Sequence, residues 1–135
     1  MREIKFRGIP IYGTEFVYGY LNVYKSEKGL IYEIITNENG TTRYEIKPET
    51  VGQYIELKDK NRKEIYEGDI IKFKIKGYGV IIYCGATYSI DIGNDITDLE
   101  FYHHQNVVEV VGNIYENPEL LSELSKNKRE EQWLK

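Results

Sequence analysis

EGDIIKFKIKGYGVIIYC, residues 67–84, is the stretch that decides the fold class of this 135-residue chain. Ile71, Phe73 and Ile75 alternate there with three lysines, so one side of a strand faces a core and the other faces solvent. Residues 77–79 contain two glycines and turn the chain into an apolar run, residues 80–84, that predicts a buried strand. The stretch therefore predicts two successive strands joined by a short turn.

Short β-type segments alternate with turn signals on both sides of this stretch. Asn39-Gly40 is a strong hairpin signal, and Gly68 permits the positive φ of a sharp strand entry that is common in SH3-like barrels. We expect a mainly β fold with a small SH3-like barrel over residues 65–116. Additional strands and a hairpin occupy residues 1–64, a short α-helix occupies residues 117–135, and the whole forms one compact unit. The expected strands are residues 4–7, 16–21, 30–36, 42–47, 51–57, 70–76, 80–84, 88–92 and 107–115.

The predicted C-terminal helix begins with favourable capping residues. Asn117 suits the N-cap, Pro118 suits the first helical position, and Glu119 complements the positive end of the helix dipole. Three leucines, at positions 120, 121 and 124, form an apolar face over the first half of the helix. We expect that half to dock on the sheet.

Composition excludes several classes of protein. No apolar run approaches the roughly 18–20 residues that cross a bilayer, and no apolar segment follows the charged N-terminus as in a signal peptide. The lone Cys84 cannot form an internal disulfide, which fits a reducing compartment. We therefore expect a cytoplasmic protein with no membrane partner, and no signature in the sequence calls for a cofactor.

The charge is unevenly placed, although the net charge is only −4. Residues 65–118 carry 3 basic and 8 acidic side chains, which is the wrong sign for binding phosphates. The best basic cluster precedes them in a polar turn diluted by Asp59 and Glu64. A solvated turn is the ordinary interpretation, but Tyr54 beside this turn gives a candidate nucleic-acid site, formed by Tyr54, Lys58, Lys60, Arg62 and Lys63.

No catalytic or metal-binding constellation is predicted. His103 and His104 are adjacent, so on a strand they face opposite sides and do not readily bind one metal; exposed loop histidines are the expectation. Cys84 ends an apolar run, where a small buried hydrophobic residue is expected rather than a nucleophile. We expect a protein that is not an enzyme.

Tyrosine is the unusual component of the sequence, with 13 copies against 4 Phe and 1 Trp. Tyrosine joins an apolar body to a polar tip and is enriched at protein interfaces. Most of the tyrosines fall in predicted strands, where they either complete a half-buried sheet or form an exposed platform for a partner or for another copy of the chain.

Six segments, in order along the chain, resemble the YopX family of phage and prophage proteins: residues 1–8 (MREIKFRG), 17–21 (VYGYL), 48–54 (PETVGQY), 57–61 (LKDKN), 63–71 (KEIYEGDII) and 111–121 (VGNIYENPELL). The resemblance implies a β-rich fold with an SH3-like element, encoded by phage genomes or prophages, and supplies no reaction. Phe16 replaces an aromatic that is commonly Trp in the family. Glu56 and Arg62 stand where the family often has glycine, which puts the turn after Leu57 in question.

Three functions follow in order of preference. The first is a non-catalytic phage accessory protein that binds a host or phage protein, or itself as a homo-oligomer. The second is a nucleic-acid-binding small barrel that uses the basic turn. The third is an enzyme that uses Cys84 or the histidines.

Overall fold

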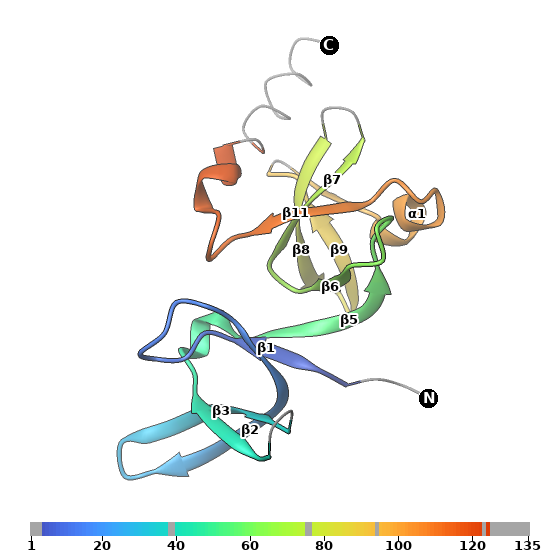
Figure 1. Cartoon of the computed structure of the whole chain (residues 1–135). Coiled ribbons are helices and arrows are strands. Elements are labelled where there is room, and N and C mark those ends of the chain that lie inside the picture. Colours follow the sequence, from blue (N-terminus) through green and yellow to red (C-terminus); the bar gives the residue numbers. More distant parts are fainter. Residues whose placement is uncertain (1–3, 38–39, 75–76, 94, 123, 125–135) are drawn as a thin grey trace. The chain divides into compact units, whose positions relative to one another are not determined.

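The computed structural model describes residues 4–37, 40–74, 77–93, 95–122 and 124, and it confirms a mainly β chain (Figure 1). Two antiparallel sheets hold most of the residues. The chain forms two compact units, residues 1–56 and 57–135. The sequence predicts one compact unit with three segments, residues 1–64, 65–116 and 117–135. The turn at residues 58–63 belongs to the second unit, where it is bonded to the strand near residue 110, as described below.

The first unit is built on the strand order β4-β3-β2-β1-β5, in which β1 to β4 pair with their neighbours in sequence and β5 returns to pair with β1. β5 crosses into the second unit, where β6 is its neighbour in the order. Ile34 and Ile46 are fully buried between these strands. The bounds are β1 Phe6–Gly8, β2 Val17–Ser26, β3 Gly29–Thr36, β4 Thr42–Glu45, a 3-10 turn Pro48–Thr50 and β5 Gly52–Lys58.

The hairpin predicted at Asn39-Gly40 is confirmed, because β3 and β4 pair up to Thr36 and Thr42 on either side of it. A longer hairpin precedes it. β2 and β3 pair from Tyr20–Ile35 to Ser26–Gly29, so β2 is longer than the predicted strand, which ended at residue 21. The added segment, residues 22–26 (NVYKS), mixes polar residues with β-formers, so its local pattern is weak.

The second unit contains a sheet of order β10-β9-β8-β7-β11. Ile71 and Phe73 of β7 are buried as the alternation predicts, and Ile70 is buried as well. This order has β10 and β11 at its two ends, so the pairing of the described strands does not establish the SH3-like barrel. The bounds are β6 Glu64–Tyr66, β7 Asp69–Lys74, β8 Gly77–Cys84, β9 Thr87–Asp91, β10 Ile96–Thr97, α1 Leu99–His104, β11 Glu109–Asn113 and a 3-10 turn Pro118–Leu121.

Helix α1 was not predicted, since the sequence indicates no strand or helix between the expected strands 88–92 and 107–115. Asp98 caps it by accepting a hydrogen bond from the Glu100 N–H at 2.9 Å. Leu99 is buried, and the ring of Tyr102 meets that of Phe73 edge-on at 4.7 Å. The helix therefore closes one side of the core of the second unit.

The predicted C-terminal helix begins where expected, because Pro118 opens a 3-10 turn that runs to Leu121. Asn117 makes no side-chain cap there; its Oδ1 accepts the Asn113 N–H instead. Residues 123 and 125–135 lie outside the described residues. In the part of the chain that is described, no helix is long and apolar enough to span a membrane.

Candidate interaction surfaces

The basic turn is folded around the carboxylate of Asp59. Oδ1 of Asp59 accepts the N–H groups of Asn61 and Lys63 at 2.8 and 2.9 Å, and Oδ2 accepts the N–H of Val110 at 2.9 Å. Asp59 is buried, whereas the cationic residues beside it are exposed. Its negative charge is thus turned inward and neutralises the surface of the turn less than the sequence suggests.

The four predicted cations lie together on this turn but differ in their contacts. Lys60 Nζ pairs with a Glu109 carboxylate oxygen at 3.4 Å. Lys58, Arg62 and Lys63 form no ion pair among the described residues. Arg62 has a φ of 67°, in the left-handed region that favours glycine.

Tyr54, the fifth predicted site residue, is not part of the unit that contains the basic turn. It belongs to the first unit, its side chain is only 5% exposed, and the Lys5 ammonium sits 5.7 Å from its ring centre. A buried ring offers no free face for a base to stack on. Tyr54 therefore cannot supply the stacking ring of the predicted nucleic-acid site.

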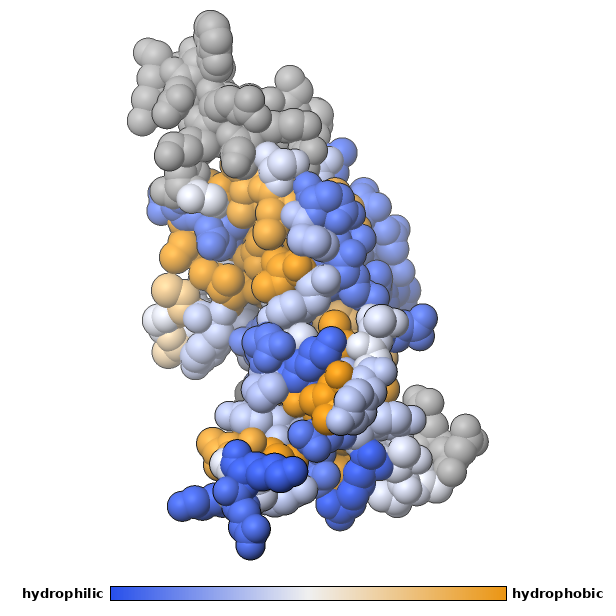
Figure 2. Space-filling view, turned by 90° about the vertical axis from the view of Figure 1, so that its left-hand side faces the viewer, coloured by the Kyte–Doolittle hydropathy of each residue, from blue (hydrophilic) through white to orange (hydrophobic). Residues whose placement is uncertain are grey.

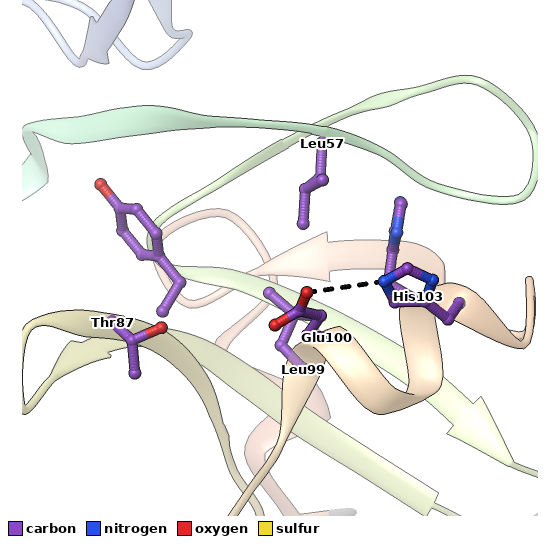
Figure 3. A pocket seen from close by; sticks show the side chains of 7 residues that line it. Leu57, Thr87, Leu99, Glu100 and His103 are labelled. Atoms are coloured by element: carbon purple, nitrogen blue, oxygen red, sulfur yellow. Dashed lines mark ion pairs between the residues drawn. The ribbon is translucent and has the colours of Figure 1, made fainter.

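A shallow pocket of about 200 Å³ lies beside α1 in the second unit (Figure 3). His103 Nε2 is 2.9 Å from the Lys58 carbonyl oxygen; because a carbonyl only accepts, this nitrogen carries the proton. His104 Nε2 is 3.5 Å from a Glu100 carboxylate oxygen one helical turn away. The pocket is lined by Leu57, Thr87, Tyr88, Leu99, Glu100, His103 and His104.

The histidines were predicted in an exposed loop; they lie on α1 instead, and only His104 is exposed. No group of three or more His, Cys, Asp or Glu side chains that could hold a metal ion occurs among the described residues. Cys84 is exposed at the end of β8, so the prediction of a buried position was wrong. Its strand runs out of the core at this end, where Tyr83 is exposed as well.

Tyrosines divide between core and surface. Tyr54 and Tyr66 are buried, five others are half-buried, and six are exposed. Three of the exposed six, Tyr18, Tyr20 and Tyr24, occur at even-numbered positions of β2 and so project from one side of the first sheet. The other three exposed tyrosines are Tyr12, Tyr44 and Tyr83.

The strand register completes this surface. Ile35 lies opposite Tyr20, Ile31 lies opposite Tyr24, and Arg43 of β4 lies opposite Ile35. Residues directly opposite each other share a side of the sheet. We call this set the tyrosine face: Tyr18, Tyr20, Tyr24, Ile31, Ile35 and Arg43. Tyr44 pairs with the buried Ile34 and therefore belongs to the other side.

A polar network anchors the middle of the tyrosine face. Glu33 is only 6% exposed, and its Oε1 accepts hydrogen bonds from Asn22 Nδ2 at 2.8 Å and from Arg43 Nη1 at 2.7 Å. A charge-assisted bond to a buried carboxylate restricts the guanidinium of Arg43, although most of the Arg43 side chain is solvent-exposed. Sequence reasoning missed Glu33 and Arg43, because nothing local marks residues ten apart as partners across two strands.

A buried cation, Arg7, supports the neighbouring part of the sheet. Arg7 lies opposite Tyr18 in the β1–β2 pairing and is buried, with its guanidinium carbon 4.2 Å from the centre of the Phe16 ring. The aromatic at position 16, which the resemblance to YopX proteins marks as usually Trp, thus has a packing role that Phe also fills.

Figure 2 shows that hydrophobic residues, coloured orange, reach the surface on the parts of both units that face the viewer. Exposed apolar residues other than tyrosine in the second unit include Ile96, Phe101, Val107 and Leu121. They come from four different segments rather than one strand, so the tyrosine face remains the best-ordered candidate surface.

Comparisons with known proteins agree with this architecture. A family model described as YopX protein matches residues 5–122. The structure of protein EF1440 from Enterococcus faecalis is similar, with a TM-score of 0.55 and 23% identity over 90% of this chain and 99% of that one. Protein yopX from Bacillus subtilis has a TM-score of 0.50 and 17% identity over 87% and 95% of the two chains. No curated protein matches the chain.

Proposed function

We propose that the chain, which belongs to the YopX family, is a non-catalytic protein-interaction module that binds through its tyrosine face. The partner is a protein of the host or the phage, or a second copy of the chain. In this proposal the protein is encoded by a phage or prophage and acts in the bacterial cytoplasm, and the second unit is an SH3-like scaffold. The observation that carries the proposal is the row Tyr18, Tyr20 and Tyr24, exposed on one side of β2.

The chemistry of this face suits a protein partner. Tyrosine and arginine are enriched among the residues that dominate binding energy at interfaces, because each buries a large area and makes directional polar contacts. Here the tyrosines are held on a paired strand and Arg43 is held by Glu33. Because these side chains are already restricted in the free protein, little conformational entropy is lost on binding, which favours affinity.

The test uses a Tyr20→Ser, Tyr24→Ser double variant. Tyr12→Ser is the matched control, because Tyr12 is 97% exposed and lies outside the tyrosine face. We expect the double variant to lose at least about 30-fold in affinity, equivalent to about 2 kcal/mol, as for interface residues of this kind. Binding is measured by titrating partners captured from lysogenic cells and by light scattering for self-association. Wild-type affinity in the double variant, or equal losses in the control, would contradict the proposal.

The buried position of Asp59 favours a second candidate, binding of nucleic acid by the basic turn. With that carboxylate inside, Lys58, Arg62 and Lys63 present a small positive surface. A gel shift at low salt tests it with single- and double-stranded DNA. Binding that weakens on adding salt and is lost on changing all three cations to alanine would support it; no shift at any salt concentration would eliminate it.

A further inference from the structure

We propose that a second copy of the chain pairs with the free edge of β2, antiparallel, with the two-fold axis at Tyr24. The proposal deepens the proposed function by naming a second copy as the partner of β2, the strand that carries the tyrosines of the tyrosine face, and it rests on that function. β1 pairs with β2 only at Val17, Tyr18 and Gly19. β2 then continues to Ser26 with β3 on one side only, and Figure 1 shows this β2–β3 hairpin extending past β1. Among the described residues, nothing pairs with the other edge of residues 21–25.

The direction of the backbone groups on this edge follows from the ladder. The Ile46 N–H donates to the Tyr32 carbonyl, so Tyr32 bonds toward β4 and its neighbours Ile31 and Glu33 bond toward β2. Their partners on β2 are Tyr24 and Asn22. The alternating residues Leu21, Val23 and Lys25 therefore direct their N–H and C=O groups to the free edge.

The side chains along the edge leave it weakly protected. Proteins usually guard an exposed strand edge with charges, proline or a bulge. Here Val23 is 41% exposed, Tyr24 is 45% exposed, and Lys25 is the only charge among residues 21–25. An edge with free bonding groups and exposed apolar side chains is suited to strand addition.

A second copy supplies a strand that fits. A two-fold axis perpendicular to the sheet leaves the tyrosine faces of both copies on the same side of the joined sheet. Because paired residues share a side, one residue of β2 must then lie opposite the same residue of the second copy, and the axis passes between these two. An axis at Val23 places Glu27 of the second copy opposite Gly19, where Phe6 already pairs. An axis at Lys25 sets two lysines directly opposite each other, which is repulsive. Between them, an axis at Tyr24 is the register that avoids both conflicts.

This register makes chemical sense along its length. Val23 lies opposite Lys25 of the second copy, and Lys25 opposite its Val23, so each pair exchanges two main-chain hydrogen bonds. The two Tyr24 residues meet as a non-hydrogen-bonded pair, whose Cα atoms are about 4.5 Å apart in antiparallel sheets. The tyrosine faces of the two copies then join into one continuous aromatic surface across the junction.

Cysteine cross-linking of the full chain tests the register directly. In a Cys84→Ser background, which removes the native exposed thiol, Tyr24→Cys should form an intermolecular disulfide in most of the protein under mild oxidation. Tyr20→Cys is the matched control, because Tyr20 is also exposed on the same strand and face but lies well away from its counterpart in the proposed register. Cross-linking of Tyr24→Cys no greater than that of Tyr20→Cys would overturn the proposal.

A second variant tests the edge without a thiol. Val23→Pro removes an N–H that has no partner among the described residues of one copy, so it should leave the melting temperature nearly unchanged while converting a dimer to a monomer in light scattering. A dimer that persists in Val23→Pro and does not cross-link through Tyr24→Cys overturns the edge pairing but leaves the tyrosine face as an interaction surface. A monomeric wild-type protein whose captured partners ignore the Tyr20→Ser, Tyr24→Ser change overturns both.

Discussion

Replacing Arg62 with glycine should stabilise the protein, although the change removes a large side chain. Arg62 has a φ of 67°, a conformation that costs an L-residue about 1–2 kcal/mol and costs glycine almost nothing. Glycine also loses about 0.5–1 kcal/mol through the greater freedom of its unfolded chain. No hydrogen bond or ion pair is made by the Arg62 side chain among the described residues, so little else is lost. The net gain is about 0.5–1 kcal/mol.

Lys63→Gly is the matched control, since it lies next in the same turn, removes the same charge and has an ordinary φ. For a unit of this size, 1 kcal/mol shifts the melting temperature by about 4–8 °C. We expect Arg62→Gly to raise the melting temperature of the second unit by about 2–8 °C in calorimetry, and Lys63→Gly to lower it by a similar amount. If both variants lower it equally, Arg62 does not occupy a left-handed conformation and the reasoning fails.

Three further predictions concern the second unit. The positive φ predicted for Gly68 is confirmed at 88°, and both its N–H and its C=O are hydrogen-bonded. Gly68→Val should therefore lower the free energy of unfolding in urea by at least about 2 kcal/mol. An unchanged urea midpoint would contradict the need for a positive φ at this turn. Asp59→Ala should lower the free energy of unfolding by about 2–4 kcal/mol, because three backbone N–H groups lose a charged acceptor. Asp98→Ala, at an exposed helix cap, is the control and should lower it by about 1 kcal/mol. Equal losses in the two variants would contradict the central role of Asp59. The native Cys84 thiol is exposed, so its rate of reaction with a chromogenic disulfide should be within about tenfold of the rate in denaturant. A native rate more than about tenfold slower would show that the thiol is covered.

The strand pattern was readable from the sequence wherever burial alternates along a single strand. Ile71 and Phe73 are buried in β7 as predicted, and the Asn-Gly hairpin joins β3 and β4. Helix α1 was missed although Asp98 provides a cap and Leu99 and Tyr102 are spaced for one face. A helix of six residues is too short for its hydrophobic pattern to stand out from the surrounding polar residues. Its stability comes from tertiary packing, such as that of Tyr102 on Phe73, rather than from local helix propensity.

The candidate surfaces depended on information that the sequence does not display locally. Tyr54 and Tyr20 both fall in tyrosine-containing strands, yet one is buried and the other is 61% exposed. Which tyrosine faces solvent is decided by the neighbouring strands, and those pairings join residues far apart in the chain. Asp59 shows the same limit: read along the sequence it dilutes a basic turn, whereas in the fold its charge is directed inward to the Val110 N–H.

The length of β2 connects these observations to function. Pairing with β1 uses only three of its ten residues, Val17–Gly19, and of the remainder Leu21 lies opposite the core residue Ile34. Residues 23–25 beyond it are exposed, and among the described residues nothing pairs with their other edge, so they carry an aggregation risk unless a partner covers them. A segment that adds this risk and buries none of its own side chains is best explained by its use in binding. The excess of tyrosine then has a location, since Tyr24 lies in this segment and Tyr20 lies next to its free edge.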